Sequence, residues 1–99
     1  MRLTPTQIES IKQAAEQIFG PDARVWLFGS RVDDSKRGGD VDLMIETDQK
    51  LENRAFLAAR MAARVSRSMQ GRRVDVITQA PGAPTQPIHQ AARRHGVPL

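Results

Sequence analysis

The feature that most constrains this chain is a pair of apolar runs that carry reactive side chains at one end. The first run ends in Gly29-Ser30. After nine intervening residues, the second run carries Asp40 and Asp42, two positions apart. In a β-strand, residues i and i+2 project from the same face, with Cα atoms about 6.5 Å apart. Two carboxylates so placed can converge on one cation, so the second run predicts a strand with a metal-binding face.

Gly29-Ser30 has the chemistry of a phosphate-binding turn. Glycine lets the backbone turn sharply and approach an anion, and the Ser30 hydroxyl and the neighbouring N–H groups can form an anion-binding nest. Alone, a Gly-Ser pair favours an ordinary loop, but the aspartates that follow reverse this preference. Arg31 either reaches a triphosphate or is solvated, and the sequence leaves both open. A phosphate cradle beside a metal clamp is what phosphoryl or nucleotidyl transfer requires.

Asp40, Asp42 and Asp75 each also have an interpretation that requires no metal. An ordinary half-exposed strand would also explain Asp40 and Asp42, although like charges this close repel each other unless a cation intervenes. Asp75 interrupts an apolar, β-branched run, and such a carboxylate is costly to bury unless it is paired or binds a metal. An ion pair with Arg72 or Arg73 is its alternative role. Glu46 lies farther along the same face as Asp42, and we exclude it as a ligand.

These motifs resemble the signature of the DNA polymerase beta-like nucleotidyltransferase superfamily, over about residues 8–80. The signature is a hydrophobic residue, Gly-Ser, a spacer and Asp-hydrophobic-Asp-hydrophobic; here it reads Phe28-Gly29-Ser30 and Asp40-Val41-Asp42-Leu43. The family places a third carboxylate on a later strand, where this chain has Asp75. The chain looks like a minimal nucleotidyltransferase, of the kind often paired with a HEPN-domain protein in prokaryotic toxin–antitoxin modules.

The resemblance implies a function and a set of roles. It implies transfer of a nucleoside monophosphate, AMP from ATP, to a hydroxyl of a partner HEPN toxin, so that the chain is a protein adenylyltransferase and an antitoxin. Two Mg²⁺ ions, with Mn²⁺ as a substitute, would assist. The catalytic and metal-binding residues would be Asp40, Asp42 and Asp75, and the phosphate-binding residues would be Gly29, Ser30 and Arg31. An antitoxin that neutralises its partner by contact, without catalysis, is the alternative.

The hydrophobic pattern predicts one α/β (α+β) domain over residues 1–99. Helices are expected over residues 4–19 and 51–69, and strands over 24–28, 40–46 and 72–78. They would form a small mixed sheet of three or more strands, with helices packed on one face and the carboxylates at one edge of the other. The tail, residues 81–99, is proline-rich with a short helix at 88–94. His89 and His95 are too few for a zinc site, and we interpret both as surface residues.

Charge and composition limit the classes of partner that we expect for this chain. The net charge is +4, and 12 of the 15 basic residues are arginine, which suits a site that binds a triphosphate or docks an acidic partner. Nucleic acid is a weaker interpretation, because no aromatic residues are interleaved with the arginines of the second helix. No apolar run is long enough to cross a membrane, and there is neither cysteine nor a charged-then-apolar leader. We therefore expect a cytoplasmic protein.

Overall fold

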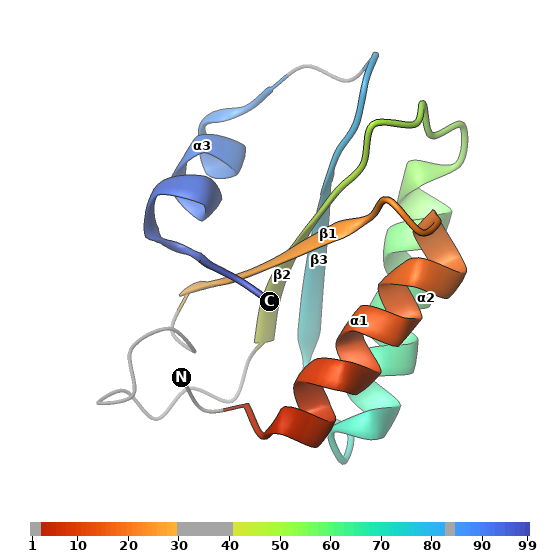
Figure 1. The fold of residues 1–99 in the computed structure, drawn as a ribbon, viewed down its shortest axis with the longest axis vertical. Helices are drawn as coiled ribbons and strands as arrows, with labels where there is room; N and C mark the ends of the chain where they lie inside the picture. Colours follow the sequence, from red (N-terminus) through yellow and green to blue (C-terminus); the bar gives the residue numbers. More distant parts are fainter. Residues whose placement is uncertain (1–2, 30–40, 83–84) are drawn as a thin grey trace.

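The computed structural model describes residues 3–29, 41–82 and 85–99, which form a four-stranded mixed sheet and three helices (Figure 1). The sheet has the strand order β3-β2-β1-β4. β1 pairs antiparallel with β2 and with β4, whereas β2 and β3 are parallel. The elements, in chain order, are α1 (Pro5–Phe19), β1 (Arg24–Phe28), β2 (Val41–Glu46), α2 (Arg54–Ser68), β3 (Val74–Gln79), α3 (Pro87–His95) and β4 (Val97–Pro98).

The first helix begins and ends where its local sequence predicts. The Thr4 hydroxyl accepts the N–H of Gln7 at 3.1 Å, and the Gln7 side chain accepts the N–H of Thr4 at 3.0 Å, which completes a capping box. Pro5 occupies the first turn, where its missing N–H leaves no helical hydrogen bond unmade. The helix ends at Gly20, whose φ of 114° few other residues adopt.

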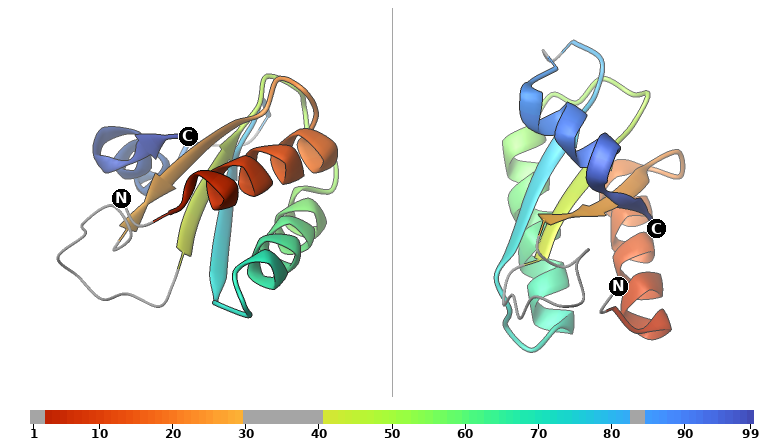
Figure 2. Two further views of the ribbon diagram at one scale, coloured as in Figure 1. Left: turned by 60° about the horizontal axis from the view of Figure 1, so that its bottom comes forward. Right: turned by 90° about the vertical axis from the view of Figure 1, so that its left-hand side faces the viewer.

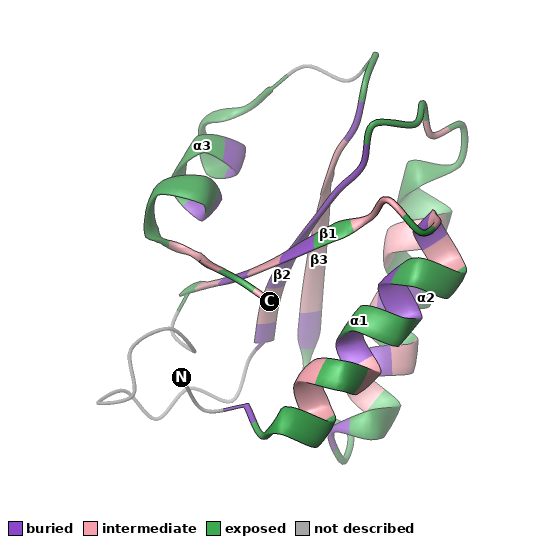
Figure 3. Cartoon of the chain, viewed as in Figure 1, coloured by how far each residue is buried: buried purple, intermediate pink, exposed green. Residues whose placement is uncertain are grey.

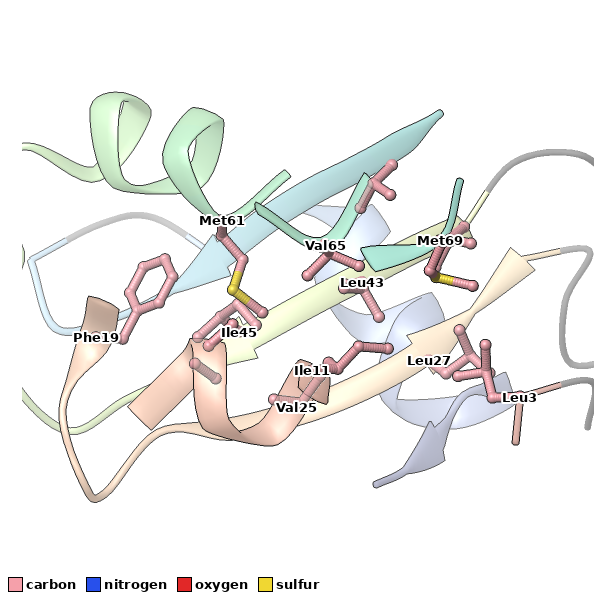
Figure 4. Packing of buried hydrophobic residues seen from close by; sticks show 14 residues of the cluster. Leu3, Ile11, Phe19, Val25, Leu27, Leu43, Ile45, Met61, Val65 and Met69 are labelled. Atoms are coloured by element: carbon pink, nitrogen blue, oxygen red, sulfur yellow. The ribbon is translucent and has the colours of Figure 1, made fainter. Parts of the chain in front are cut away.

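The core lies between the sheet and the two longer helices. Alternate β2 residues Val41, Leu43 and Ile45 are completely buried there. α1 and α2 pack side by side over this face, and Ile11, Met61 and Val65 interdigitate with the strand residues (Figure 4). Because α2 connects two parallel neighbours, it must cross the sheet between them. Because successive side chains of a strand point to opposite faces, Asp42, Met44 and Glu46 of β2 lie on the other face of the sheet.

The opposite face is partly covered by α3, a helix that the sequence predicts at residues 88–94 without indicating which face of the sheet it covers. We expected helices on one face, and this holds for α1 and α2; α3 lies across the other side, as two views of the ribbon show (Figure 2). Met44 of β2 and Ala92 of α3 are both completely buried. Figure 3 shows buried stretches in both elements. The tail ends in β4, which pairs with β1 at Trp26 and Leu27. None of the helices in the described part of the chain is long and apolar enough to cross a membrane.

Candidate active site

Two of the three expected carboxylates lie side by side on neighbouring strands. Asp42 of β2 and Asp75 of β3 are register partners in the parallel ladder, and Phe28 of β1 is the partner of Asp42 on the other side. Residues in register on adjacent strands share a face, and the strands lie about 4.8 Å apart. Because Val41 and Leu43 occupy the core face, both aspartates belong to the face that α1 and α2 leave uncovered. The fold thus brings together acids 33 positions apart in the sequence.

Gly29, directly after β1, lies next to the Asp42 carboxylate. Its φ is 78°, a left-handed conformation that favours glycine, and a Cβ atom built on it would lie 2.2 Å from Oδ2 of Asp42. A side chain at this position would therefore collide with the carboxylate. The backbone of Gly29, directly after β1, thus lies close to the Asp42 carboxylate. The phosphate-binding role that the sequence predicts for Gly29 stays a prediction.

Asp75 takes part in the ion pair that was its alternative role. Arg73 Nε lies 3.4 Å from Asp75 Oδ1, and the two side chains are 72% and 47% exposed. Exposed pairs of this kind contribute about 0–1 kcal/mol. Arg73 therefore holds Asp75 weakly, and the carboxylate stays accessible from solvent. The pairing is compatible with a second role for Asp75.

The chemistry of the described site residues fits a divalent cation. Mg²⁺ is usually bound through one or two carboxylates together with substrate phosphates and water, and Asp42 and Asp75 supply two carboxylates in register. Across residues 3–29, 41–82 and 85–99, no three acidic, histidine or cysteine side chains converge on one metal position. The predicted site residues Ser30, Arg31 and Asp40 lie outside the described residues, so their roles stay predictions.

Glu46, which we excluded as a ligand, has a structural role at the far end of β2. It is 8% exposed, and its carboxylate pairs with Arg24 Nε at 3.0 Å and with Arg93 Nη2 of α3. Arg24 also contacts Asp48 at 3.2 Å. Glu46 lies four positions beyond Asp42, or about 13 Å along a strand. The acids of β2 therefore serve two separate sites, and Glu46 ties α3 to the sheet.

Glu46→Gln is expected to lower the free energy of unfolding by about 1–2 kcal/mol, because it removes a largely buried carboxylate that both Arg24 and Arg93 contact, and Arg24 keeps only its exposed contact with Asp48. Asp48→Asn removes the same charge from a side chain that is 79% exposed and should change stability by less than about 0.5 kcal/mol. Urea unfolding measures both. Equal effects would mean that the Glu46 pairs do not hold α3.

The expectation that His89 is a surface residue is wrong. It is 8% exposed, and its Nδ1 accepts the N–H of Gln86 at 2.9 Å, which caps the start of α3. The position directly after Pro87 and Ile88 was the available signal, since a polar residue at N3 often bonds back to the residue before the helix. His95 is exposed, as expected.

An open mixed sheet with in-register aspartates beside a glycine turn is suited to the transfer of phosphorus-containing groups. The model of the nucleotidyltransferase domain family matches residues 8–94, and the chain therefore belongs to this family. One chain of a crystal structure of a mutant of the toxin–antitoxin pair MntA–HpeT has a similar fold, with a TM-score of 0.69 and 17% identity. The match covers 98% of this chain and 71% of that chain. No curated protein sequence matches this one.

Proposed function

We propose that this nucleotidyltransferase is an antitoxin that acts in the cytoplasm. It transfers AMP from ATP to a hydroxyl group of a HEPN-domain toxin, and the transfer depends on Mg²⁺ or Mn²⁺. The observation that carries the proposal is the register of Asp42 and Asp75 on parallel strands, with Gly29 against Asp42. The fold shared with one chain of a toxin–antitoxin complex supports the choice of partner.

Each residue of the site has a role in this reaction. Gly29, Ser30 and Arg31 bind the β- and γ-phosphates, while Asp40, Asp42 and Asp75 are the metal ligands. Bound Mg²⁺ would neutralise charge on the triphosphate and on the departing pyrophosphate. A carboxylate oxygen of Asp75 accepts the proton of the attacking hydroxyl. The hydroxyl oxygen forms a bond to the α-phosphorus, and the bond from that phosphorus to the bridging oxygen breaks, which releases pyrophosphate.

The exposure of the site supports a macromolecular acceptor. Asp75 is 47% exposed, and a large substrate can approach its carboxylate from solvent. Orientation of the attacking group is worth several orders of magnitude in rate, and a docked protein can supply that orientation. We therefore expect the isolated chain to turn over ATP slowly and the partner to accelerate the transfer.

The test is a mixture of the chain, the HEPN-domain toxin, ATP and Mg²⁺, followed by mass spectrometry of the toxin. We expect one AMP adduct, on a tyrosine hydroxyl of the toxin. Asp40→Asn combined with Asp42→Asn should abolish the adduct while the complex still forms, and Asp48→Asn serves as a control remote from the site. A toxin that is neutralised without an adduct would identify a contact-only antitoxin. An adduct made by the double variant would contradict the roles of the carboxylates.

A further inference from the structure

β3 is an edge strand whose outer side is open in the described part of the chain. The N–H of Val41 donates to the carbonyl of Arg73 at 2.9 Å, and the N–H of Thr47 donates to that of Gln79 at 3.0 Å. In a parallel ladder, alternate residues direct their backbone groups to the same neighbour. Residues 73, 75, 77 and 79 therefore bond to β2, and residues 74, 76 and 78 direct their N–H and carbonyl groups outward. These groups form a template for a further strand.

A groove runs along the second half of this edge. Its volume is about 290 Å³, and β3 contributes Val76, Ile77 and Thr78 to its lining. The start of α2 forms one wall and the start of α3 the other, so the strand edge lies between two helices. The ribbon views place β3 at the outside of the sheet, with α2 and α3 on opposite faces (Figure 2). The remaining lining residues are Arg54, Ala55, Ala58, Gln86 and His89.

The polar lining of the groove favours an anion. His89 is 92% buried, and because its Nδ1 accepts the N–H of Gln86, the neutral ring carries its proton on Nε2 and presents a donor there. Arg54 lies in the first turn of α2 and adds a guanidinium, which binds carboxylates in two-pronged fashion. None of the described residues that line the groove is acidic. The groove therefore combines a strand edge with a charged, donor-rich pocket.

We propose that the β3 edge and this groove receive an extended acidic segment of the toxin. The segment adds to the sheet as a fifth strand, bonds to the outward backbone groups of Val76 and Thr78, and places a carboxylate against Arg54 and His89. This inference rests on the function proposed above. Strand addition supplies affinity through the backbone, and the pocket selects the side chain.

The docking site lies on the strand that carries the candidate proton acceptor. Asp75 is three residues from Thr78, which corresponds to about 10 Å along a strand. A segment paired with β3 extends past Asp75 in either direction of pairing. Docking at this edge therefore brings the toxin chain to the carboxylates, and it explains how a small domain can orient a hydroxyl on another protein.

The face of α2 that points away from the groove also carries an arginine. This residue provides a matched control for Arg54. Phe56 is 64% exposed on this outer face of α2, and Arg60 lies on the same side of the helix, turned away from the groove. Arg54 and Arg60 are both exposed residues of α2, so Arg54→Glu and Arg60→Glu change the net charge equally. An acidic residue in the first turn also favours the helix dipole, so Arg54→Glu is expected to fold.

The experiment measures toxin binding by calorimetry and amide hydrogen exchange by NMR in the complex. Arg54→Glu should weaken binding roughly tenfold or more, because it places a like charge against the acidic segment, while Arg60→Glu changes affinity less than about twofold. The amides of Val76 and Thr78 should exchange at least about tenfold more slowly in the complex than in the free chain.

The outcomes separate the docking site from the function. If the toxin binds and accepts AMP but the amides of Val76 and Thr78 stay unprotected, the docking site is overturned and the function stands. The same holds if Arg60→Glu weakens binding and Arg54→Glu does not, which would place the toxin on the outer face of α2. A toxin that does not bind the wild-type chain at all overturns both.

Discussion

Asp42→Asn is expected to lower the affinity for ATP in the presence of Mg²⁺ by at least about 100-fold. Changes to residues that only orient metal ligands cost about 10–100-fold, and the loss of a ligand should cost no less. The amide keeps the shape of the carboxylate and removes its charge, so the effect reports the cation. Isothermal titration calorimetry with ATP, with and without Mg²⁺, measures it.

Asp48→Asn is the charge-matched control for this variant. Asp48 is 79% exposed and follows the opposite end of β2, so its loss changes the net charge equally without touching the site. It should leave the metal-dependent affinity within about twofold, since surface charges at this distance are largely screened. Equal affinity of Asp42→Asn and the wild type would remove Asp42 from the metal site.

Gly29→Ala is expected to abolish AMP transfer and to cost about 1–3 kcal/mol of stability. The stability loss comes from placing a non-glycine residue at a φ of 78°. The loss of transfer has a separate cause, because the new Cβ would lie 2.2 Å from Oδ2 of Asp42 and must displace the carboxylate. Urea unfolding and the mass-spectrometric transfer assay measure the two effects.

Gly71→Ala distinguishes the effect of the strained backbone from the effect of a new Cβ atom on Asp42. Gly71 has a similar φ of 81°, but nothing lies within 4 Å of the Cβ that it would gain. It should therefore lose about as much stability as Gly29→Ala and keep its transfer activity. If both variants lose activity, general destabilisation explains the result, and the contact between Gly29 and Asp42 has no special part in it.

Local patterns in the sequence predicted most of the fold. The alternation of β2 placed Val41 and Leu43 in the core and Asp42 on the other face, because successive side chains of a strand point to opposite faces. The cap at Thr4 and the stop at Gly20 predicted α1 nearly to the residue. These signals are contained in a few adjacent positions, which is why one sequence suffices to read them.

The features that were missed depend on partners far along the chain. Glu46 pairs with Arg93, 47 positions later, and nothing near either residue indicates the pairing. β4 has only two residues, one of them proline, and carries no strand pattern of its own. Likewise, the sequence placed Asp42 and Asp75 on strands but could not say that these strands are neighbours. Ser30, Arg31 and Asp40 stay predictions.

The parallel register of β2 and β3 has a consequence for how this site can tolerate change. A slip of β3 by one residue would turn Asp75 into the core and bring Val74 and Val76 out to the solvent side. Burying an unpaired carboxylate while exposing two valines is heavily unfavourable. Insertions or deletions between α2 and β3 must therefore be absorbed within the turn. The packing of residues that take no part in the chemistry therefore fixes the position of Asp75 relative to Asp42.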